Sequence, residues 1–173
     1  MSVVVWDGKS LAADKQGQMG DMKITVNKTR RFLSDIGLIV MAWTGEQEQG
    51  LMLADWFCDG AAKDKYPAFQ NTDYWSCLVI VDDNGLSYFE KQPVRQVVTD
   101  SFIAFGSGRY YAMGAMAMGA DAEKAVLIAS MFDAHCGCGV DVLRRKSNFT
   151  LDAVGCQQDN HAQINDQGAF YAS

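Results

Sequence analysis

Residues 106–116 read GSGRYYAMGAM, and this stretch decides how the fold is interpreted. Gly106-Ser107-Gly108 ends a short β-prone run at 102–105, and the residues rich in alanine and methionine that follow predict a helix from about 109 to 118. Asp121 can cap a second helix that runs to about Phe132. A strand followed at once by two helices late in the chain predicts helices that are grouped apart from the strands.

The start of the chain predicts a β-hairpin. Val3–Trp6 is β-prone, Asp7-Gly8 is a turn signal, and Lys9–Asp14 returns. A turn at Asp7-Gly8 sets Asp14 opposite about Met1 and Ala13 opposite Ser2. In this register the hairpin is short.

Further strands and one helix are expected in the middle of the chain. Lys15–Asp21 is polar and predicts a loop, as does the proline-containing stretch from 61 to 73. The helix should open after Thr44-Gly45-Glu46, where an acidic residue suits a helix N-terminus. The expected strands are 22–26, 30–33, 36–42, 74–81, 86–89, 102–105 and 140–143. Long runs of strands without strand–helix alternation favour an α+β fold with antiparallel sheets over a doubly wound one.

Length and composition limit the classes of function. The 173 residues fit one domain, expected over 1–147, followed by an edge strand and polar tail at 148–173. A net charge of −6 makes non-specific nucleic-acid binding unfavourable, and no apolar run approaches the ~20 residues of a membrane span. The start lacks a secretory signal, so we expect a cytoplasmic protein whose five cysteines are reduced.

Five segments in order resemble the proteasome β-subunit and HslV-like family. Residues 106–116 resemble the GSG-x-x-YA-x-GA-x signature, and FDAHCGCGVDVL at 132–143 resembles D-x-x-[ST]-G-G-x-[IV]-x-[VL]. GADAEKA at 119–125 resembles the cap of the family's next helix. Met22-Lys23 with KTRRF at 28–32 resembles the HslV pattern MK…K-x-RRL, and LAAD at 11–14 resembles the second strand. The resemblance covers about residues 2–146. It implies the four-layer αββα sandwich of N-terminal nucleophile (Ntn) hydrolases, and a short bacterial or phage-type relative.

The resemblance implies a nucleophile at the chain start. In this superfamily the first residue of the mature chain attacks an amide, and its own α-amine is the general base. An α-amine has an ordinary pKa of ~7.7–8.0, which suits that role. Ser2 is the candidate, because its small side chain favours removal of Met1. It stands where the family usually has threonine, often after a cleaved propeptide that is not expected here.

The resemblance also implies the partners of this nucleophile. Lys28 matches the lysine beside it, Asp14 the aspartate that pairs with the lysine, and Ser107 and Asp133 the pair that orients the terminal amine. A buried ammonium would favour ionisation of the hydroxyl. The oxyanion and substrate-binding pair of the family reads Thr44-Gly45 here.

Cys136 stands where the family has serine or threonine, so we assign it a supporting role. His135-Cys136-Gly137-Cys138 holds only three potential ligands without a second pair, and no metal or other cofactor is expected.

Three functions remain open. The first is a proteasome- or HslV-like peptidase in a homo-oligomeric ring, acting on peptides or unfolded proteins, with a possible ATPase unfoldase partner. The second is a catalytically inactive Ntn-fold subunit that self-assembles as a binding or structural protein. The third is an amidase for a small amide, acting without a ring chamber.

Overall fold

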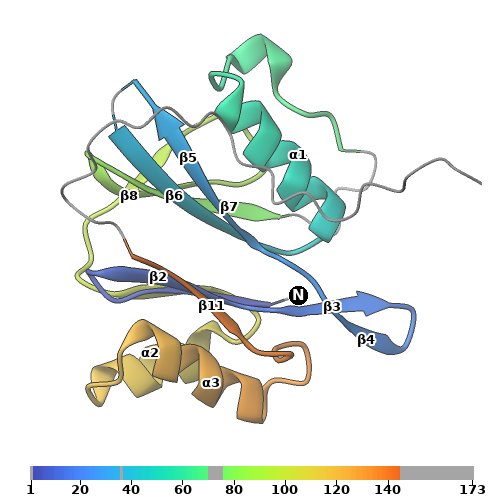
Figure 1. Ribbon diagram of the computed structural model, residues 1–173, viewed down its shortest axis with the longest axis vertical. Helices are drawn as coiled ribbons and strands as arrows, with labels where there is room; N and C mark the ends of the chain where they lie inside the picture. Colours follow the sequence, from blue (N-terminus) through green and yellow to red (C-terminus); the bar gives the residue numbers. More distant parts are fainter. Residues whose placement is uncertain (1, 36, 70–75, 145–173) are drawn as a thin grey trace, which may run out of the picture.

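The computed structural model describes residues 2–35, 37–69 and 76–144, and they form two sheets, a projecting hairpin and helices (Figure 1). The four-stranded sheet has the order β10-β1-β2-β11 and the five-stranded sheet the order β5-β6-β7-β8-β9, with β3 and β4 as a separate pair. All paired strands are antiparallel. The strands are β1 (Val3–Trp6), β2 (Ser10–Asp14), β3 (Gln16–Met19), β4 (Met22–Thr25), β5 (Thr29–Ser34), β6 (Gly37–Thr44), β7 (Cys77–Asp82), β8 (Gly85–Phe89), β9 (Gln96–Val98), β10 (Ile103–Gly106) and β11 (Val140–Arg144). The helices are α1 (Gln47–Cys58), the 3-10 turn η1 (Lys63–Lys65), α2 (Arg109–Ala117) and α3 (Ala122–Phe132).

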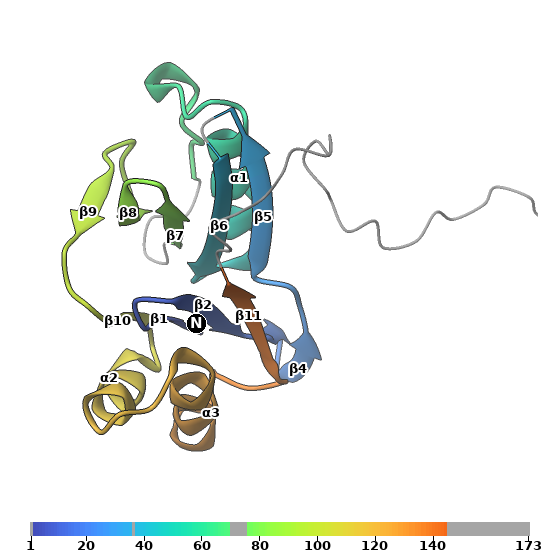
Figure 2. The same cartoon turned by 60° about the vertical axis from the view of Figure 1, so that its left-hand side comes forward.

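Side-chain alternation along the strands separates three apolar clusters. Val3 and Val5 pack with α2 and α3, whereas Val4 between them packs against the other sheet. Val40 and Ala42 of β6 face the same inter-sheet cluster as Val4, and the alternate residues of β6 pack under α1. Because successive strand residues point to opposite faces, each sheet is apolar on both sides. The packing order is therefore α1, five-stranded sheet, four-stranded sheet, then α2 with α3 (Figure 2).

The first hairpin has a different register from the one that the sequence predicts. Val4 pairs with Ala13 and Trp6 with Leu11, so the connection is four residues long, from Asp7 to Ser10. The carboxylate of Asp7 accepts hydrogen bonds from the backbone N–H groups of Lys9 (2.9 Å) and Ser10 (2.7 Å), which stabilises the wider turn. Asp14 consequently lies level with Val3 and not with Met1. The predicted two-residue turn was wrong, and with it the placement of Ala13 opposite Ser2.

Other boundaries also changed. The stretch 15–21, predicted as a loop, contains β3 and the turn into β4. This strand was missed because its polar residues lack the apolar alternation that marks a strand in the sequence. The short edge strand β9 and the turn η1 were missed for the same reason. The two predicted late helices are confirmed, and Asp121 caps α3 by accepting a hydrogen bond from the N–H of Lys124 (2.9 Å). The expected edge strand and tail at 148–173 lie outside the described residues.

Candidate active site

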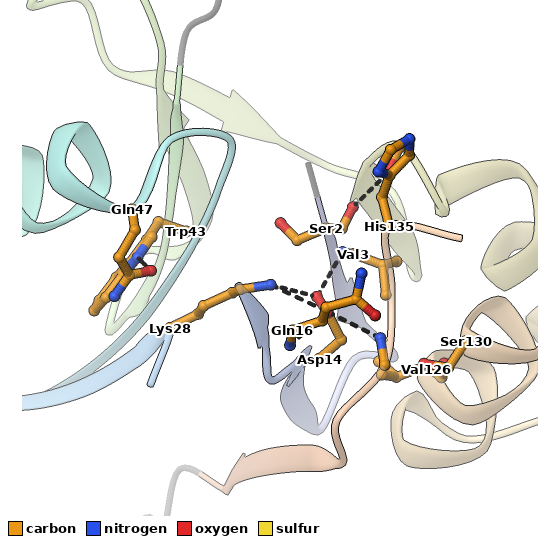
Figure 3. A network of polar contacts seen from close by, with 12 residues as sticks. Ser2, Val3, Asp14, Gln16, Lys28, Trp43, Gln47, Val126, Ser130 and His135 are labelled. Atoms are coloured by element: carbon orange, nitrogen blue, oxygen red, sulfur yellow. Dashed lines mark hydrogen bonds and ion pairs between the residues drawn. The ribbon is translucent and has the colours of Figure 1, made fainter. Parts of the chain in front are cut away.

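A buried ion pair lies at one end of the two sheets. The Lys28 ammonium donates to both carboxylate oxygens of Asp14, at 3.0 and 3.1 Å, and the two side chains are 5% and 0% exposed (Figure 3). The same carboxylate accepts backbone N–H hydrogen bonds from Val3 (2.9 Å), Gln16 (3.0 Å) and Gly137 (3.2 Å). These donors hold the buried carboxylate in one orientation.

Lys28 enters the site from the five-stranded sheet. It directly precedes β5, and its backbone carbonyl accepts a hydrogen bond from the N–H of Trp43 (3.0 Å) near the end of β6. Burial lowers the pKa of Lys28, although the neighbouring Asp14 carboxylate acts in the opposite direction. The side chain thus bridges the space between the sheets, and its positive charge sits where water is excluded.

Ser2 lies beside this pair at the start of β1. It is fully buried, and its hydroxyl has no hydrogen-bond partner among the described residues. An unpaired buried hydroxyl costs roughly 1–3 kcal/mol, so such groups call for a functional or structural explanation. The next residue, Val3, donates to Asp14, which ties Ser2 closely to the ion pair.

Gly106 sets the contact between Ser2 and the end of β10. A Cβ atom built on Gly106 would lie 2.0 Å from the carbonyl oxygen of Ser2 and 3.1 Å from the methyl group of Thr44, and its φ is +90°. Only glycine satisfies both the left-handed backbone and this close approach. The same glycine therefore brings Ser2 and Thr44 together from separate sheets.

Ser107 and Asp133 approach Ser2 from the other side. The Ser107 hydroxyl lies 3.4 Å from the Ser2 carbonyl oxygen and also within hydrogen-bond reach of the Asp133 carboxylate, and its single proton can be donated to either of these two acceptors. Partial burial alone would raise the pKa of Asp133, but hydrogen bonds from the backbone of His135 and the side chains of Ser107 and Cys136 outweigh it and lower the pKa. Asp133 thus remains ionised at neutral pH.

Cys136 fills the space behind these groups. It is 2% exposed, and its sulfur lies 2.8 Å from where a Cβ on Gly108 would be, so the two pack tightly. Burial, assisted by the charges of Asp14 and Asp133, raises the pKa of Cys136 to about 12. The thiol is therefore protonated at neutral pH and is not a nucleophile. Among the residues that the structure describes, this site included, no three histidine, cysteine or acidic side chains gather as a metal site requires.

The structure thus gathers the residues that the resemblance singles out. Seven of these residues lie around the start of β1: Ser2, Asp14, Lys28, Thr44, Ser107, Asp133 and Cys136. Gly45 follows Thr44 in the link to α1, and its φ is +96°. Sequence reasoning missed the contacts of Gln16 and Gly137 with Asp14. Gln16 belongs to no motif, and Gly137 was quoted in the motif at 132–143 without a contact being assigned to it. Gly106 was quoted in the motif, but only the folded chain shows its contact with Ser2.

Two facing antiparallel sheets, covered on their outer faces by α1 and by α2 with α3, are the arrangement of a proteasome-like fold. The comparisons with solved structures show this same fold. BPH from Thiobacillus denitrificans, a bacterial proteasome homologue solved in complex with epoxomicin, has a TM-score of 0.63 at 23% identity and covers 83% of this chain and 97% of its own. HslV from Trypanosoma brucei has a TM-score of 0.59 at 19% identity, covering 82% of this chain and 97% of its own.

The Anbu (Gly-1) mutant from Hyphomicrobium sp. strain MC1 also matches, with a TM-score of 0.59 at 9% identity over 84% of this chain and 82% of its own. No protein-family model matches the sequence, and no curated protein matches it. At these identities the shared property is the fold. None of the helices within the described segments has the length and apolar character needed to cross a membrane.

Proposed function

We propose that the chain is a proteasome- or HslV-like peptidase whose nucleophile is Ser2, exposed as the N-terminal residue by removal of Met1. One observation carries this proposal. The Ser2 hydroxyl is buried without a partner in the described residues, beside the Lys28–Asp14 pair. A serine in a purely structural role would satisfy its hydroxyl or be exposed.

The proposed chemistry is amide hydrolysis in two steps. The free α-amine of Ser2 accepts the hydroxyl proton as Oγ attacks the carbonyl carbon of the substrate amide. The resulting tetrahedral intermediate collapses, and the ammonium returns the proton to the departing amine, which leaves an ester on Ser2. Water, activated by the same amine, then hydrolyses the ester.

Lys28 supplies the electrostatic part of this scheme. Its ammonium, buried beside Ser2, stabilises negative charge that develops on Oγ more strongly than it would in water. Asp14 acts as the positioning residue, because it binds the ammonium through both oxygens and is itself fixed by the Val3 N–H.

The remaining residues serve the amine and the oxyanion. Ser107 and the ionised Asp133 lie on the side of Ser2 where its backbone is bound, and we assign them to orienting the amine. We assign the N–H of Gly45 to the oxyanion, Thr44 to the substrate backbone, and Cys136 to support of Ser107. None of these steps uses a metal or other cofactor.

The assembly is part of the proposal. We infer that the packed layers form the αββα sandwich of one domain over 1–147, and that copies close into a homo-oligomeric ring. Peptides or unfolded proteins are the proposed substrates, an ATPase unfoldase is a possible partner, and the cytoplasm is the proposed location. The ring-like assembly is what distinguishes this proposal from an amidase for small amides.

Peptide-amide hydrolysis by four proteins tests the proposal. The wild type should cleave a fluorogenic peptide amide, Ser2→Ala should abolish cleavage with assembly intact, and Lys28→Ala should nearly do so. Ser2→Cys is the matched control, because it keeps a nucleophile of similar size at the same position. Full activity in both alanine variants would show that the mechanism is wrong.

An inactive scaffold is the second candidate. The missing partner of the Ser2 hydroxyl favours the peptidase, whereas the complete burial of this side chain, which closes it to a substrate, favours the scaffold. If Met1 stays on the chain, the nitrogen of Ser2 is part of a peptide bond, so Ser2 has no free amine and the terminal-amine mechanism cannot operate. Such a protein would assemble normally and show the same lack of hydrolysis in the wild type and in Ser2→Ala.

A further inference from the structure

Gln16 is a buried amide that the proposed mechanism does not use. It lies two residues after Asp14, at the start of β3, and is 2% exposed. Its backbone N–H donates to Asp14 Oδ2 (3.0 Å), and its side-chain Nε2 donates to the carbonyl oxygen of Ala134 (2.8 Å). The residue therefore has one hydrogen bond on each of two segments that are far apart in sequence. Figure 3 shows Gln16 beside Asp14.

The segment that Gln16 reaches is the loop 133–139, which connects α3 to β11. This loop is also fixed at Gly137, whose N–H donates to Asp14 (3.2 Å) and whose carbonyl accepts from the N–H of Lys15 (3.0 Å). A Cβ on Gly137 would lie 2.8 Å from Gln16 Oε1, so the amide rests directly on the loop backbone. Two side chains therefore bind this loop: the Asp14 carboxylate at Gly137, and the Gln16 amide at Ala134.

The two segments carry opposite halves of the proposed site. Asp14 holds Lys28, whereas the loop begins with Asp133, which contacts Ser107. We propose that Gln16 is a positioning residue, whose side-chain amide fixes the spacing between the Asp14–Lys28 pair and the Asp133–Ser107 pair. Its catalytic consequence rests on the proposed function, but the structural tie can be measured without it.

Gln16→Met is the informative variant, since methionine has a similar length and lacks the N–H donor. Loss of the tie lets the loop move away from Asp14, and displacements near 1 Å at a reacting site reduce rates about 100-fold. We expect kcat to fall roughly 10- to 100-fold with KM nearly unchanged. A weaker Ser107 contact should also raise the pKa of Asp133 toward its ordinary value, which titration of the folded protein measures.

Trp56→Phe is the matched control. Trp56 is 5% exposed, and its indole N–H donates to the carbonyl of Ala62 at the same distance of 2.8 Å, but in the α1 layer remote from the site. The control removes one side-chain donor from a backbone carbonyl, so it should lower thermal stability comparably and leave kcat and the pKa of Asp133 unchanged. A Gln16→Met enzyme with the kcat of this control would overturn the proposal.

Amide hydrogen exchange at Gly137 gives a readout that does not depend on activity. Exchange at Gly137 should be at least about tenfold faster in Gln16→Met than in wild type, and unchanged in Trp56→Phe. Unchanged exchange in Gln16→Met would also overturn the proposal. If the wild type hydrolyses nothing, the proposed function fails, and this exchange measurement alone decides whether Gln16 sets the spacing.

Discussion

Replacing Lys28 with methionine tests the buried ion pair most sharply. The variant keeps most of the side-chain volume and removes the charge, which leaves the fully buried Asp14 carboxylate without its cation. Removing one partner of a buried pair typically costs about 3–5 kcal/mol. Asp14 keeps its three backbone N–H donors, from Val3, Gln16 and Gly137, so we place the cost near the lower end, at about 3 kcal/mol.

The assay is denaturant-induced unfolding combined with thermal melting. For a chain of this size a loss of 1 kcal/mol lowers Tm by about 2–4 °C, so Lys28→Met should melt about 6–12 °C below wild type. Adding Asp14→Asn to Lys28→Met removes the stranded charge and should recover much of the lost stability. Neither variant should hydrolyse peptides. A cost below about 1 kcal/mol, typical of exposed ion pairs, would refute the reasoning that this pair is buried and coupled.

Three further predictions concern the surrounding residues. Gly106→Ala should be destabilised by about 3 kcal/mol or fail to fold, because its Cβ meets the Ser2 carbonyl in a left-handed backbone; urea titration measures the loss. Asp133→Asn should be less stable than wild type at pH 7. Since the folded pKa of Asp133 is lowered, this difference should persist above pH 3.8 and vanish only as the pH falls through the folded value; melting curves across pH check this. Iodoacetamide at pH 8 should alkylate the exposed Cys138 and spare Cys136, whose pKa is raised to about 12; peptide mass spectrometry separates the two, and equal labelling would contradict the buried thiol.

Strongly patterned segments made most of the fold predictable. The apolar run before Thr44 and the alanine- and methionine-rich stretch after Gly108 gave β6 and α2 from local signals. The strand at 22–26 was expected and matches β4, but β3 escaped prediction because its glutamines and glycine lack alternation. The register of the first hairpin was also hidden, since it depends on the Asp7 carboxylate binding the turn backbone.

Only part of the candidate site could be predicted from the sequence. The positions of Asp14 and Lys28 came from a resemblance, and their 3.0 Å contact follows from the folded arrangement of two sheets. Gln16 and Gly137 could not be predicted, because their roles arise from contacts across more than a hundred residues. The sequence around Ser2 marks this residue only by its place after Met1. That its hydroxyl is buried without a partner among the described residues is known only from the folded chain.

The central claim is that Ser2 is a terminal nucleophile, and intact mass measures it directly. The protein, expressed from its own Met1, is weighed before and after incubation with a β-lactone probe, with Ser2→Ala treated in parallel. We predict a wild-type mass lacking one methionine residue, a gain of one probe that fragmentation places on Ser2, and no gain in Ser2→Ala. A retained Met1, or a wild-type mass that the probe does not change, would contradict the claim and favour the inactive scaffold.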